Sequence, residues 1–444
     1  MKLLYTLFLV GLLHTIGNAQ TVDKAKLDQF FDRLAENNKA MGSLVIAKDG
    51  NLIYSRSIGY SEINETLKNP LTLNTRYRIA SITKMYTAVL IFQLVEEGKL
   101  KLTDVLSKFY PQIASADKIT IAQILSHSSG IHDALIDPNL RSKPKTSPIT
   151  KDEIVTLISK ASSDFEPGTK HAYSNSGYAV LGLIIEKVTG KPYEEVLRQK
   201  ISSKLGLKNT YIATQNINVT QNEALTYRYN GSWKQEIETH PSNLFGGGFM
   251  ISTPTEMITF IDALFNHKLI SEDHLSLMKT IKDGEGFGME AFEFAGKKFY
   301  GHTGGADNYG AWLMCMPEEK LTIAYTTNAK VYPVGEMMKG IMNSYYNKSY
   351  ELPTFESIAI STAILDSYTG IYATSEAPIK FTVMRKDNIL YIQPIRESAA
   401  PLEATAQNKF RIEGVNGLTI EFDSNKKQLI MKRPNGERIF TKEN

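Results

Sequence analysis

Apolar and polar positions near the start of the chain follow two different periods. Between residues 27 and 34 the apolar side chains recur at intervals of three and four, which predicts an amphipathic helix. Residues 43–48 and 52–57 are apolar, β-prone segments, and the Asp49-Gly50 pair between them is typical of a hairpin turn. A helix followed by an antiparallel hairpin indicates an α+β domain.

The most apolar helix is predicted directly after Ser81. The segment from Met85 to Val95 has helical length, and Gly98 ends it just after two acidic residues. The pattern therefore places Ser81 at the start of a buried helix.

Further helices are indicated by the residues that begin them. Thr120, Thr150 and Thr253 each stand three residues before Gln or Glu and lead into apolar segments, which is the signature of a capping box. Residues 131–149 are rich in Pro, Asp, Lys and Ser and predict a long surface loop, which could border a cleft. Three glycines, 246–248, precede the third box and permit close backbone approach to a ligand or to the Ser81 helix.

The character of the chain changes near residue 346. Short β-prone segments then alternate with turn pairs such as Asn416-Gly417, which predicts an all-β barrel or sandwich. We therefore expect one domain over residues 20–345, a linker over 346–361 and a small β domain over 362–444.

The first 19 residues have the features of a secretory signal peptide. Lys2 supplies a positive charge, residues 3–13 are apolar, and residues 17–19 offer a small-residue cleavage site. No later apolar run approaches the ~20 residues that a membrane helix needs. We therefore expect a secreted or periplasmic protein with no stable membrane span.

Composition narrows the classes of function. The chain has 444 residues, of which 42% are hydrophobic, enough for one large core and a second, smaller one. The formal net charge is only +3 and no basic run stands out, so no nucleic-acid partner is expected. The single cysteine, Cys315, rules out an internal disulfide and a cysteine-based metal site.

Ser81 and Lys84 are the first candidates for chemistry. Side chains three residues apart on a helix are neighbours, with Cβ atoms roughly 5–6 Å apart. The lysine amine can therefore reach the serine hydroxyl where water is kept away, and the pair can act as nucleophile and base. The S-x-x-K pattern is weak alone and recurs along the chain, but only Ser81 leads into a strongly apolar helix.

Two further segments carry polar groups beside predicted turns. Tyr173 and Asn175 precede an apolar helix and can both project into a cleft, although Asn175 could instead simply cap the helix. His302, in the Gly-rich segment 301–305, is expected at the end or edge of a strand. Glycine there leaves room for a substrate and exposes an N–H as an oxyanion donor; a structural turn histidine is the alternative.

A histidine flanked by serines, His127, suggests a Ser-His pair at first sight. Triad partners normally come from distant positions in the chain, because residues one or two apart cannot easily adopt the required geometry. We therefore expect His127 to be a hydrogen-bonded structural residue.

Taken together, these candidates resemble a known family. Three motifs occur in order behind the signal peptide: Ser81-x-x-Lys84, Tyr173-x-Asn175 and His302-Thr303-Gly304. The set resembles the penicillin-recognising serine hydrolases, which include class C β-lactamases, secreted D-alanyl-D-alanine carboxypeptidases, and related esterases and D-aminopeptidases. The resemblance covers about residues 24–345 and implies an antiparallel sheet flanked by helices with a helical subdomain. The C-terminal segment is similar to the small lipocalin-like β-barrels appended to some members.

The resemblance also implies how the reaction would run. Ser81 would attack a carbonyl to form an acyl-enzyme, while Lys84 and Tyr173 would move the protons. Burial should lower the pKa of the lysine, and the neighbouring cation should favour the phenolate form of the tyrosine. Water would then release the product, and neither a metal nor another cofactor is implied.

Substrate binding falls to the remaining motif residues under the same resemblance. The implied substrate-binding residues are Asn175, His302, Thr303 and Gly304. The backbone N–H groups of Ser81 and Gly305 would form the oxyanion hole, a contribution of roughly 3–4 kcal/mol per donor in comparable sites.

The third motif departs from class C β-lactamases, which carry Lys-Thr-Gly where this chain has His302-Thr303-Gly304. A histidine is mostly neutral at pH 7, so a permanent cation for a β-lactam carboxylate is missing. The leading hypothesis is a secreted serine hydrolase for small peptide, amide or ester substrates, similar to a D-alanyl-D-alanine carboxypeptidase or D-amino-acid peptidase. An esterase or weak β-lactamase is the alternative among enzymes, and a non-catalytic binding or scaffold protein that retains the fold is the alternative of another class.

Overall fold

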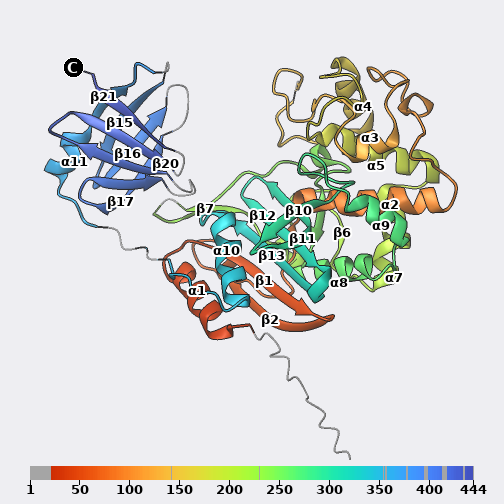
Figure 1. Ribbon diagram of the computed structural model, residues 1–444, viewed down its shortest axis with the longest axis horizontal. Helices are drawn as coiled ribbons and strands as arrows, with labels where there is room; N and C mark the ends of the chain where they lie inside the picture. Colours follow the sequence, from red (N-terminus) through yellow and green to blue (C-terminus); the bar gives the residue numbers. More distant parts are fainter. Residues whose placement is uncertain are drawn as a thin grey trace, which may run out of the picture.

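The computed structural model describes residues 22–443, except residues 142, 230, 354, 356–357, 377–378, 395–398, 413–417 and 434–435. Figure 1 shows an α+β body, with a sheet at its centre and a group of helices at one end, joined to a separate small β-barrel. The predicted signal peptide, residues 1–19, lies outside the described residues. Within them, no helix is both long and apolar enough to cross a membrane.

A six-stranded antiparallel sheet forms the centre of the body. Its strands, in spatial order, are β10 (Glu290–Phe294), β11 (Lys297–Ala306), β12 (Tyr309–Met316), β13 (Leu321–Ala329), β1 (Met41–Lys48) and β2 (Asn51–Ile58). The predicted hairpin is confirmed as β1 and β2, and Asp49 and Gly50 both adopt positive φ between them, as a tight hairpin turn requires. The chain enters and leaves the sheet on adjacent strands, since β1 pairs with β13.

Helices pack on both faces of this sheet and extend to one side of it. They are α1 (Lys24–Glu36), α2 (Thr83–Glu96), α3 (Ile121–Leu125), α4 (Lys151–Lys160), α5 (Asn175–Thr189), α6 (Tyr193–Leu197), α7 (Ser203–Leu205), α8 (Pro254–Phe265), α9 (Glu272–Met278) and α10 (Val334–Tyr345). A short π-helix, Arg198–Ser202, links α6 to α7. The predicted loop over residues 131–149 contains no helix or strand at its described positions.

Alternation along β1 separates two cores. Leu44 and Ile46 belong to the core on the side of α1 and α10, while Val45 and Ala47 belong to the core that α8 covers and that contains α2. This is the period-two pattern of a strand buried on both faces. The sheet is therefore sandwiched between helices, as the fold-class prediction required.

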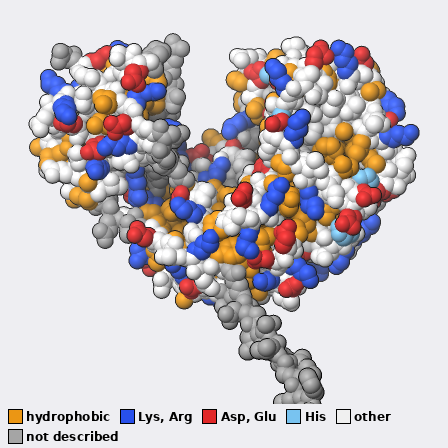
Figure 2. Space-filling view, viewed as in Figure 1, with side chains coloured by type: hydrophobic (Ala, Val, Ile, Leu, Met, Phe, Trp, Pro, Cys, Tyr) orange, Lys and Arg blue, Asp and Glu red, His pale blue; other side chains and the backbone are white. Residues whose placement is uncertain are grey.

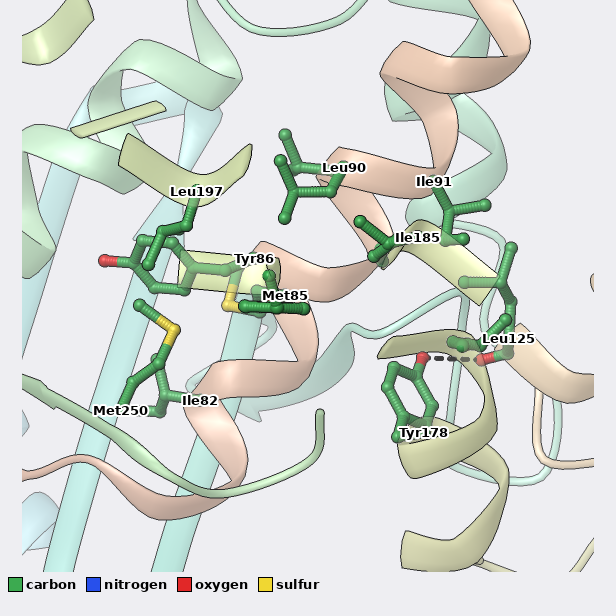
Figure 3. Packing of buried hydrophobic residues seen from close by; sticks show 14 of the residues in the cluster. Ile82, Met85, Tyr86, Leu90, Ile91, Leu125, Tyr178, Ile185, Leu197 and Met250 are labelled. Atoms are coloured by element: carbon green, nitrogen blue, oxygen red, sulfur yellow. Dashed lines mark hydrogen bonds between the residues drawn. The ribbon is translucent and has the colours of Figure 1, made fainter. Parts of the chain in front are cut away.

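Helix α2 runs through the larger core. Every residue from Thr83 to Leu94 is buried, which explains why the helix is apolar all round rather than amphipathic. Figure 3 shows Met85, Tyr86 and Leu90 of this helix packed among side chains from α5, α6 and strand β9 (Met250–Ser252). The hydroxyl of Tyr178 on α5 donates a hydrogen bond to the Leu125 carbonyl oxygen (2.8 Å).

Two of the three predicted capping boxes are complete. Thr120 and Thr150 each accept from the backbone N–H three residues on, and Gln123 and Glu153 bond back to them. Thr253 also caps its helix, but Glu256 accepts from the backbone of another loop at residues 208–209 instead. The third box is therefore wrong in this detail, because a tertiary contact takes the glutamate.

Short strands outside the central sheet connect these helices. They are β3 (Tyr60–Ile63), β4 (Lys68–Pro70), β5 (Tyr77–Arg78), β6 (Tyr211–Ile212), β7 (Tyr227–Tyr229), β8 (Trp233–Gln235) and β9 (Met250–Ser252). Strand β9 pairs with both β5 and β6. Because β5 ends three residues before Ser81, this small sheet fixes the approach of the chain to the start of α2.

The C-terminal part is a closed antiparallel barrel, so the barrel-or-sandwich prediction resolves to a barrel. Helix α11 (Thr362–Tyr368) leads into its strands: β14 (Gly370–Ala373), β15 (Lys380–Lys386), β16 (Ile389–Pro394), β17 (Ala400–Ala406), β18 (Lys409–Ile412), β19 (Thr419–Asp423), β20 (Gln428–Arg433) and β21 (Gly436–Lys442). The barrel meets the body through an ion pair between Lys39 and Glu403 (3.4 Å). Figure 2 shows a deep notch between barrel and body on the face in view.

Candidate active site

Ser81 lies in a short 3-10 turn, η1 (Ala80–Ile82), immediately before α2. The residue before it, Ala80, has a φ of +45°, a conformation that costs free energy for a residue with a Cβ. Strain of this kind persists only where the surrounding structure holds it, and it is concentrated at functional sites. The predicted position of Ser81 at the start of a buried helix is confirmed.

Lys84 places its amine beside Ser81. Its Nζ donates to Ser81 Oγ (3.1 Å), to Asn175 Oδ1 (2.9 Å) and to the Gly247 carbonyl oxygen (2.9 Å). The side chain is fully buried, and this burial lowers the pKa of Lys84 to about 7, although Asp133, Glu285 and Glu290 act in the opposite direction. The amine is therefore able to accept a proton near neutral pH.

The glycine run brings the backbone against this amine. A Cβ on Gly247 would lie 3.3 Å from Lys84 Nζ, and one on Gly246 would lie 2.3 Å from the Tyr178 carbonyl oxygen. These distances leave no space for larger residues. Gly247 thus permits a close approach to Lys84 on the Ser81 helix, one of the two uses predicted for the glycine run, whereas Gly246 permits a close approach to the backbone of α5.

Tyr173 and Asn175 reach the same place from the start of α5. Ser174, not Asn175, caps this helix by accepting from the Gly177 N–H (3.0 Å). Asn175 is therefore free to bridge two groups: its Oδ1 accepts from Lys84, and its Nδ2 donates to Asp133 Oδ2 (2.8 Å). The alternative in which Asn175 merely caps the helix is wrong.

His127 supports the segment that carries Tyr173. Its Nδ1 accepts from the Ser174 N–H (3.0 Å), and its ring stacks on the Tyr173 ring with centroids 4.4 Å apart. Burial, followed by the nearby Lys84, holds the pKa of His127 well below its usual range. The histidine is a neutral structural residue, as predicted.

Asp133 is a site residue that the sequence reasoning missed. Its Oδ1 accepts from the Ser176 N–H (3.0 Å) and hydroxyl (3.1 Å), while Oδ2 holds the Asn175 amide. It comes from the loop 131–149, which was expected to border a cleft. A carboxylate in a loop rich in charged residues gives no local signal that could have singled it out.

The protonation of Tyr173 is opposite to the expected one. Although Tyr173 exposes 36% of its surface, its hydroxyl interacts with Ser81 in the interior of the site. Burial raises the pKa of Tyr173 above its usual value, and nearby carboxylates raise it further, outweighing the Ser81 interaction. Lys84 lies over the ring, with Nζ 4.6 Å from the centroid, but the phenol remains protonated and can act as a proton donor.

Strand β11 presents an open edge beside Ser81. Its pairing with β10 ends at Gly301, whereas its pairing with β12 continues to Ala306. Beyond Gly301 the free edge faces η1, where a Cβ on Gly304 would lie 2.2 Å from the Ile79 carbonyl oxygen and 3.3 Å from the Ser81 nitrogen. The strand-edge position predicted for this motif is confirmed, and Gly304 permits the close contact.

His302 itself is fully buried beneath this edge. Its Nδ1 lies 2.5 Å from the Thr303 carbonyl oxygen and 3.5 Å from Glu290 Oε1. Burial is the main cause that lowers the pKa of His302, so the ring is neutral at pH 7. The side chain lies outside the set of residues that line the cavity, while the backbone of this motif continues to Gly305, which does line it.

Two carboxylates complete the environment of Lys84. Glu290 accepts from the Thr303 N–H (2.9 Å) and hydroxyl (3.1 Å), and burial together with Glu290 raises the pKa of Glu285 to about 8. Glu285, Glu290 and His302 could offer ligand atoms to a metal ion within 4.8 Å. Because both Glu290 oxygens already hold Thr303, we interpret the cluster as part of the electrostatic environment of Lys84.

A cavity of about 780 Å³ opens over these groups. Ser81 of the first motif and Tyr173 and Asn175 of the second line it, as does Gly305, the residue that follows the third motif; His302, Thr303 and Gly304 are not among its lining residues. The rest of the wall comes largely from the loop 131–149 and from residues 239–248. Its size is that of a site for a small molecule or a short peptide.

Comparisons with known proteins agree with this geometry. A family model described as Beta-lactamase matches residues 27–341. Penicillin-binding protein 4* of Bacillus subtilis (strain 168) is 24% identical over 424 residues, covering 89% of this chain and 93% of that protein. Teichoic acid D-alanine hydrolase of Staphylococcus aureus (strain MRSA252) is 30% identical over 243 residues, covering 54% of this chain and 58% of that protein.

Solved structures share the architecture. The octameric penicillin-binding protein homologue from Pyrococcus abyssi superimposes with a TM-score of 0.66 at 26% identity, covering 94% of this chain and 100% of that one. The D-amino acid amidase from Ochrobactrum anthropi SV3, in complex with D-phenylalanine, has a TM-score of 0.64 at 23% identity and covers 73% of this chain and 99% of its own. The second likeness concerns the fold of the α+β body.

Proposed function

Because this chain belongs to the beta-lactamase family and is a serine hydrolase, we propose that it cleaves an amide or ester of a D-amino acid through an acyl-enzyme on Ser81. The observation that carries the proposal is the contact between Lys84 Nζ and Ser81 Oγ at 3.1 Å, made by an amine whose pKa burial lowers to about 7. A neutral amine in hydrogen-bond contact with a serine hydroxyl is a general base for nucleophilic attack.

The proton path follows from the two protonation states. Neutral Lys84 accepts the Ser81 proton as Oγ attacks the carbonyl carbon, and the N–H groups of Ser81 and Gly305 stabilise the oxyanion. Tyr173 donates its phenolic proton to the leaving nitrogen or oxygen and is reprotonated by Lys84. In the second half, Lys84 takes a proton from a water that attacks the acyl carbon. Lys84 then returns this proton to Ser81 Oγ as the bond between Oγ and the acyl carbon breaks, which releases the acid product and restores neutral Lys84.

Asn175 is proposed to orient the amide of the acyl portion of the substrate. Asp133 and Lys84 fix its side chain from opposite ends, so its position is set before substrate binds. We propose that the His302-Thr303-Gly304 motif binds substrate through the β11 edge at Gly304 and the following Gly305, because the His302 side chain is buried and the Thr303 N–H already donates to Glu290. The substrate would lie along this edge as an added strand.

The preference for a D-amino acid is drawn from the names of the relatives. They include a teichoic acid D-alanine hydrolase and a D-amino acid amidase. Neutral His302 supplies no permanent cation, which argues against efficient β-lactam hydrolysis. We further propose that residues 1–19 direct the protein out of the cytoplasm. Substrates of this kind occur in cell walls, which lie outside it.

The test compares N-acetyl-D-alanine and N-acetyl-L-alanine, each as a thiobenzyl ester and as a p-nitroanilide. We expect at least about a tenfold higher kcat/KM for the D compounds, because a pocket shaped for one enantiomer misplaces the other. Ser81→Ala should abolish turnover of all four. Equal rates for both enantiomers would contradict the D-amino-acid proposal, and turnover of the esters alone would favour an esterase.

A further inference from the structure

Arg141 is a cationic side chain in the wall of the cavity that the mechanism above does not use. It lies in the loop 131–149, the same loop that supplies Asp133 to the site. The side chain is partly buried, and this burial lowers the pKa of its guanidinium. A buried cation costs free energy unless a partner compensates it, so its partners are informative.

Both hydrogen-bond partners of Arg141 are uncharged. Its Nη1 donates to the Leu135 carbonyl oxygen (2.8 Å), and its Nη2 donates to Asn243 Oδ1 (2.6 Å). Over the described residues no carboxylate lies within ion-pair distance of it, and the other three of its five N–H donors have no protein acceptor. The guanidinium therefore retains both its charge and free donors.

The other cations of the cavity wall differ from Arg141 in this respect. Lys143 forms an ion pair with Glu153 (2.5 Å), and Lys145 forms one with Asp307 (3.0 Å). Their charges are compensated within the protein. Over the residues that the structure describes, Arg141 is thus the cation of this wall that has no carboxylate partner.

The position of Arg141 is fixed from two sides. Leu135, which accepts from Nη1, is itself anchored, because its N–H donates to Ser176 Oγ on α5 (3.3 Å). Asn243, which accepts from Nη2, is buried and donates to the carbonyl oxygens of Lys145 (3.0 Å) and Ser147 (2.9 Å). A binding group held in this way loses little entropy when ligand arrives.

We propose that Arg141 binds a carboxylate on the acyl portion of the substrate, and this assignment rests on the function proposed above. The acyl side is indicated because the loop reaches the catalytic groups through Asp133 and Asn175, the residue proposed to orient the acyl amide. A carboxylate is indicated because the planar guanidinium fork matches its two oxygens. The preferred substrates are therefore D-aminoacyl compounds with an acidic group on the acyl side.

Two thioester pairs test this proposal on the full-length protein. N-succinyl- and N-glutaryl-D-alanine thiobenzyl esters carry a carboxylate on the acyl side at two different distances from the scissile bond. In the matched controls this carboxylate is converted to a methyl ester, which removes the charge and keeps a similar shape. We expect wild type to prefer the free acids, and Arg141→Gln to lose on the order of 10- to 100-fold in kcat/KM on the better acid, as expected for charged hydrogen bonds. Turnover of the methyl esters should change less than about threefold, which is the scale of a lost neutral contact.

Matched variants separate charge, geometry and loop integrity. Lys118→Gln removes one positive charge at an exposed ion pair with Glu166 and should leave the preference for the free acids intact. Arg141→Lys keeps the positive charge but lacks the planar guanidinium, so it should retain part of that preference. Equal losses of Arg141→Gln on acids and methyl esters would mean that Arg141 only supports the loop, and would overturn the proposal. A wild type with no preference for the acids would overturn it as well.

The hydrolase proposal and the Arg141 assignment would be contradicted by different results. If wild type hydrolyses none of these esters and Ser81 forms no adduct with a fluorophosphonate, the hydrolase proposal fails and Arg141 has no substrate to orient. If turnover is Ser81-dependent but indifferent to the carboxylate, the function stands and the Arg141 assignment is wrong.

Discussion

The amine of Lys84 lies in a fully buried position and contacts oxygen atoms of Ser81, Asn175 and Gly247. At the residue scale, these contacts orient the amine, whereas burial sets its proton affinity. Desolvation favours the neutral form of a lysine, and nearby carboxylates favour the charged form. The balance leaves the pKa of Lys84 at about 7, where a base is most useful.

The pH dependence of kcat/KM should report this balance. Below a pH of about 7 the amine is protonated and cannot accept the Ser81 proton, so activity should fall as pH decreases through that value. Turnover of the N-acetyl-D-alanine thiobenzyl ester measured from about pH 5 to about pH 9 would show the limb. Activity that still rises about tenfold per pH unit at pH 9, as expected for the ordinary lysine value of about 10.4, would contradict a buried neutral base. Burial lowers the pKa of both His127 and His302, so neither accounts for a limb near 7.

Asp133 positions Asn175 and also acts on Lys84 through its charge. Of the influences that raise the pKa of Lys84, the Asp133 charge is the largest. Asp133→Asn should therefore move the acid limb to lower pH, while kcat/KM falls roughly 10- to 100-fold because Asn175 is misplaced. Asp137→Asn in the same loop, which loses a contact with His132, is the matched control and should do neither. A loss of activity with an unmoved limb would restrict Asp133 to a structural role.

At the element scale, the start of α5 determines where Tyr173 and Asn175 lie. Ser174 caps this helix with its side chain and also donates its N–H to His127. Helix α4 has an equivalent cap in Thr150, which lies on the exposed side of the helical group. The two caps allow the stability of a helix to be separated from the positioning of the site.

Ser174→Ala and Thr150→Ala should each lower the free energy of unfolding by about 1 kcal/mol, the usual value of an N-cap. Only Ser174→Ala should also lower kcat/KM, because the first turn of α5 carries Asn175. Urea unfolding and thioester turnover measured on both variants would test this. An equal loss of activity in both would show that helix stability alone limits the site.

The sequence predicted elements where local signals decide them. The hairpin at Asp49-Gly50, the caps Thr120 and Thr150 and the all-round apolar α2 each depend on residues close together in the chain. Glu256 does not complete its capping box because the backbone N–H groups of residues 208–209 donate to it instead. No signal in the sequence around Glu256 predicts that contact. The local sequence could therefore predict the type of each element, but it could not predict that a distant loop would compete for a side chain.

The same distinction holds for the site. The Ser81, Tyr173 and His302 motifs were found because their order along the chain resembles a family. Asp133 and Glu285 were missed because their roles depend on distances to Lys84 that only the folded chain defines. The protonation of Tyr173 was predicted in the wrong direction, since its burial and the surrounding carboxylates could not be derived from the local sequence.

At the scale of the whole molecule, the site and the barrel are separate. Among the residues that the structure describes, those that line the cavity all lie between Ala80 and Asp307. The barrel strands begin at Gly370 and meet the body through contacts such as Lys39 with Glu403. The segment before the barrel belongs partly to the body, because Tyr350, Leu352 and Phe355 pack against the core beneath α1 and α10.

A chain that ends at residue 361 should therefore keep an active site. It retains the packed segment and lacks α11 and the barrel, so we expect Ser81-dependent turnover of the thiobenzyl ester within about threefold of the full-length rate. Circular dichroism and thermal unfolding would establish that the shortened chain is folded. A folded chain that fails to react would show that the barrel contributes to the site, contrary to this account.

The most direct test of the central claim is the intact mass of the protein after incubation with a fluorophosphonate and, separately, with a labelled penicillin. The account predicts a single fluorophosphonate adduct on wild type that is absent from Ser81→Ala. A Ser81-dependent penicillin adduct would in addition indicate a pocket for wall-peptide-like substrates. No adduct from either reagent, or an adduct that persists in Ser81→Ala, would contradict Ser81 as the activated nucleophile.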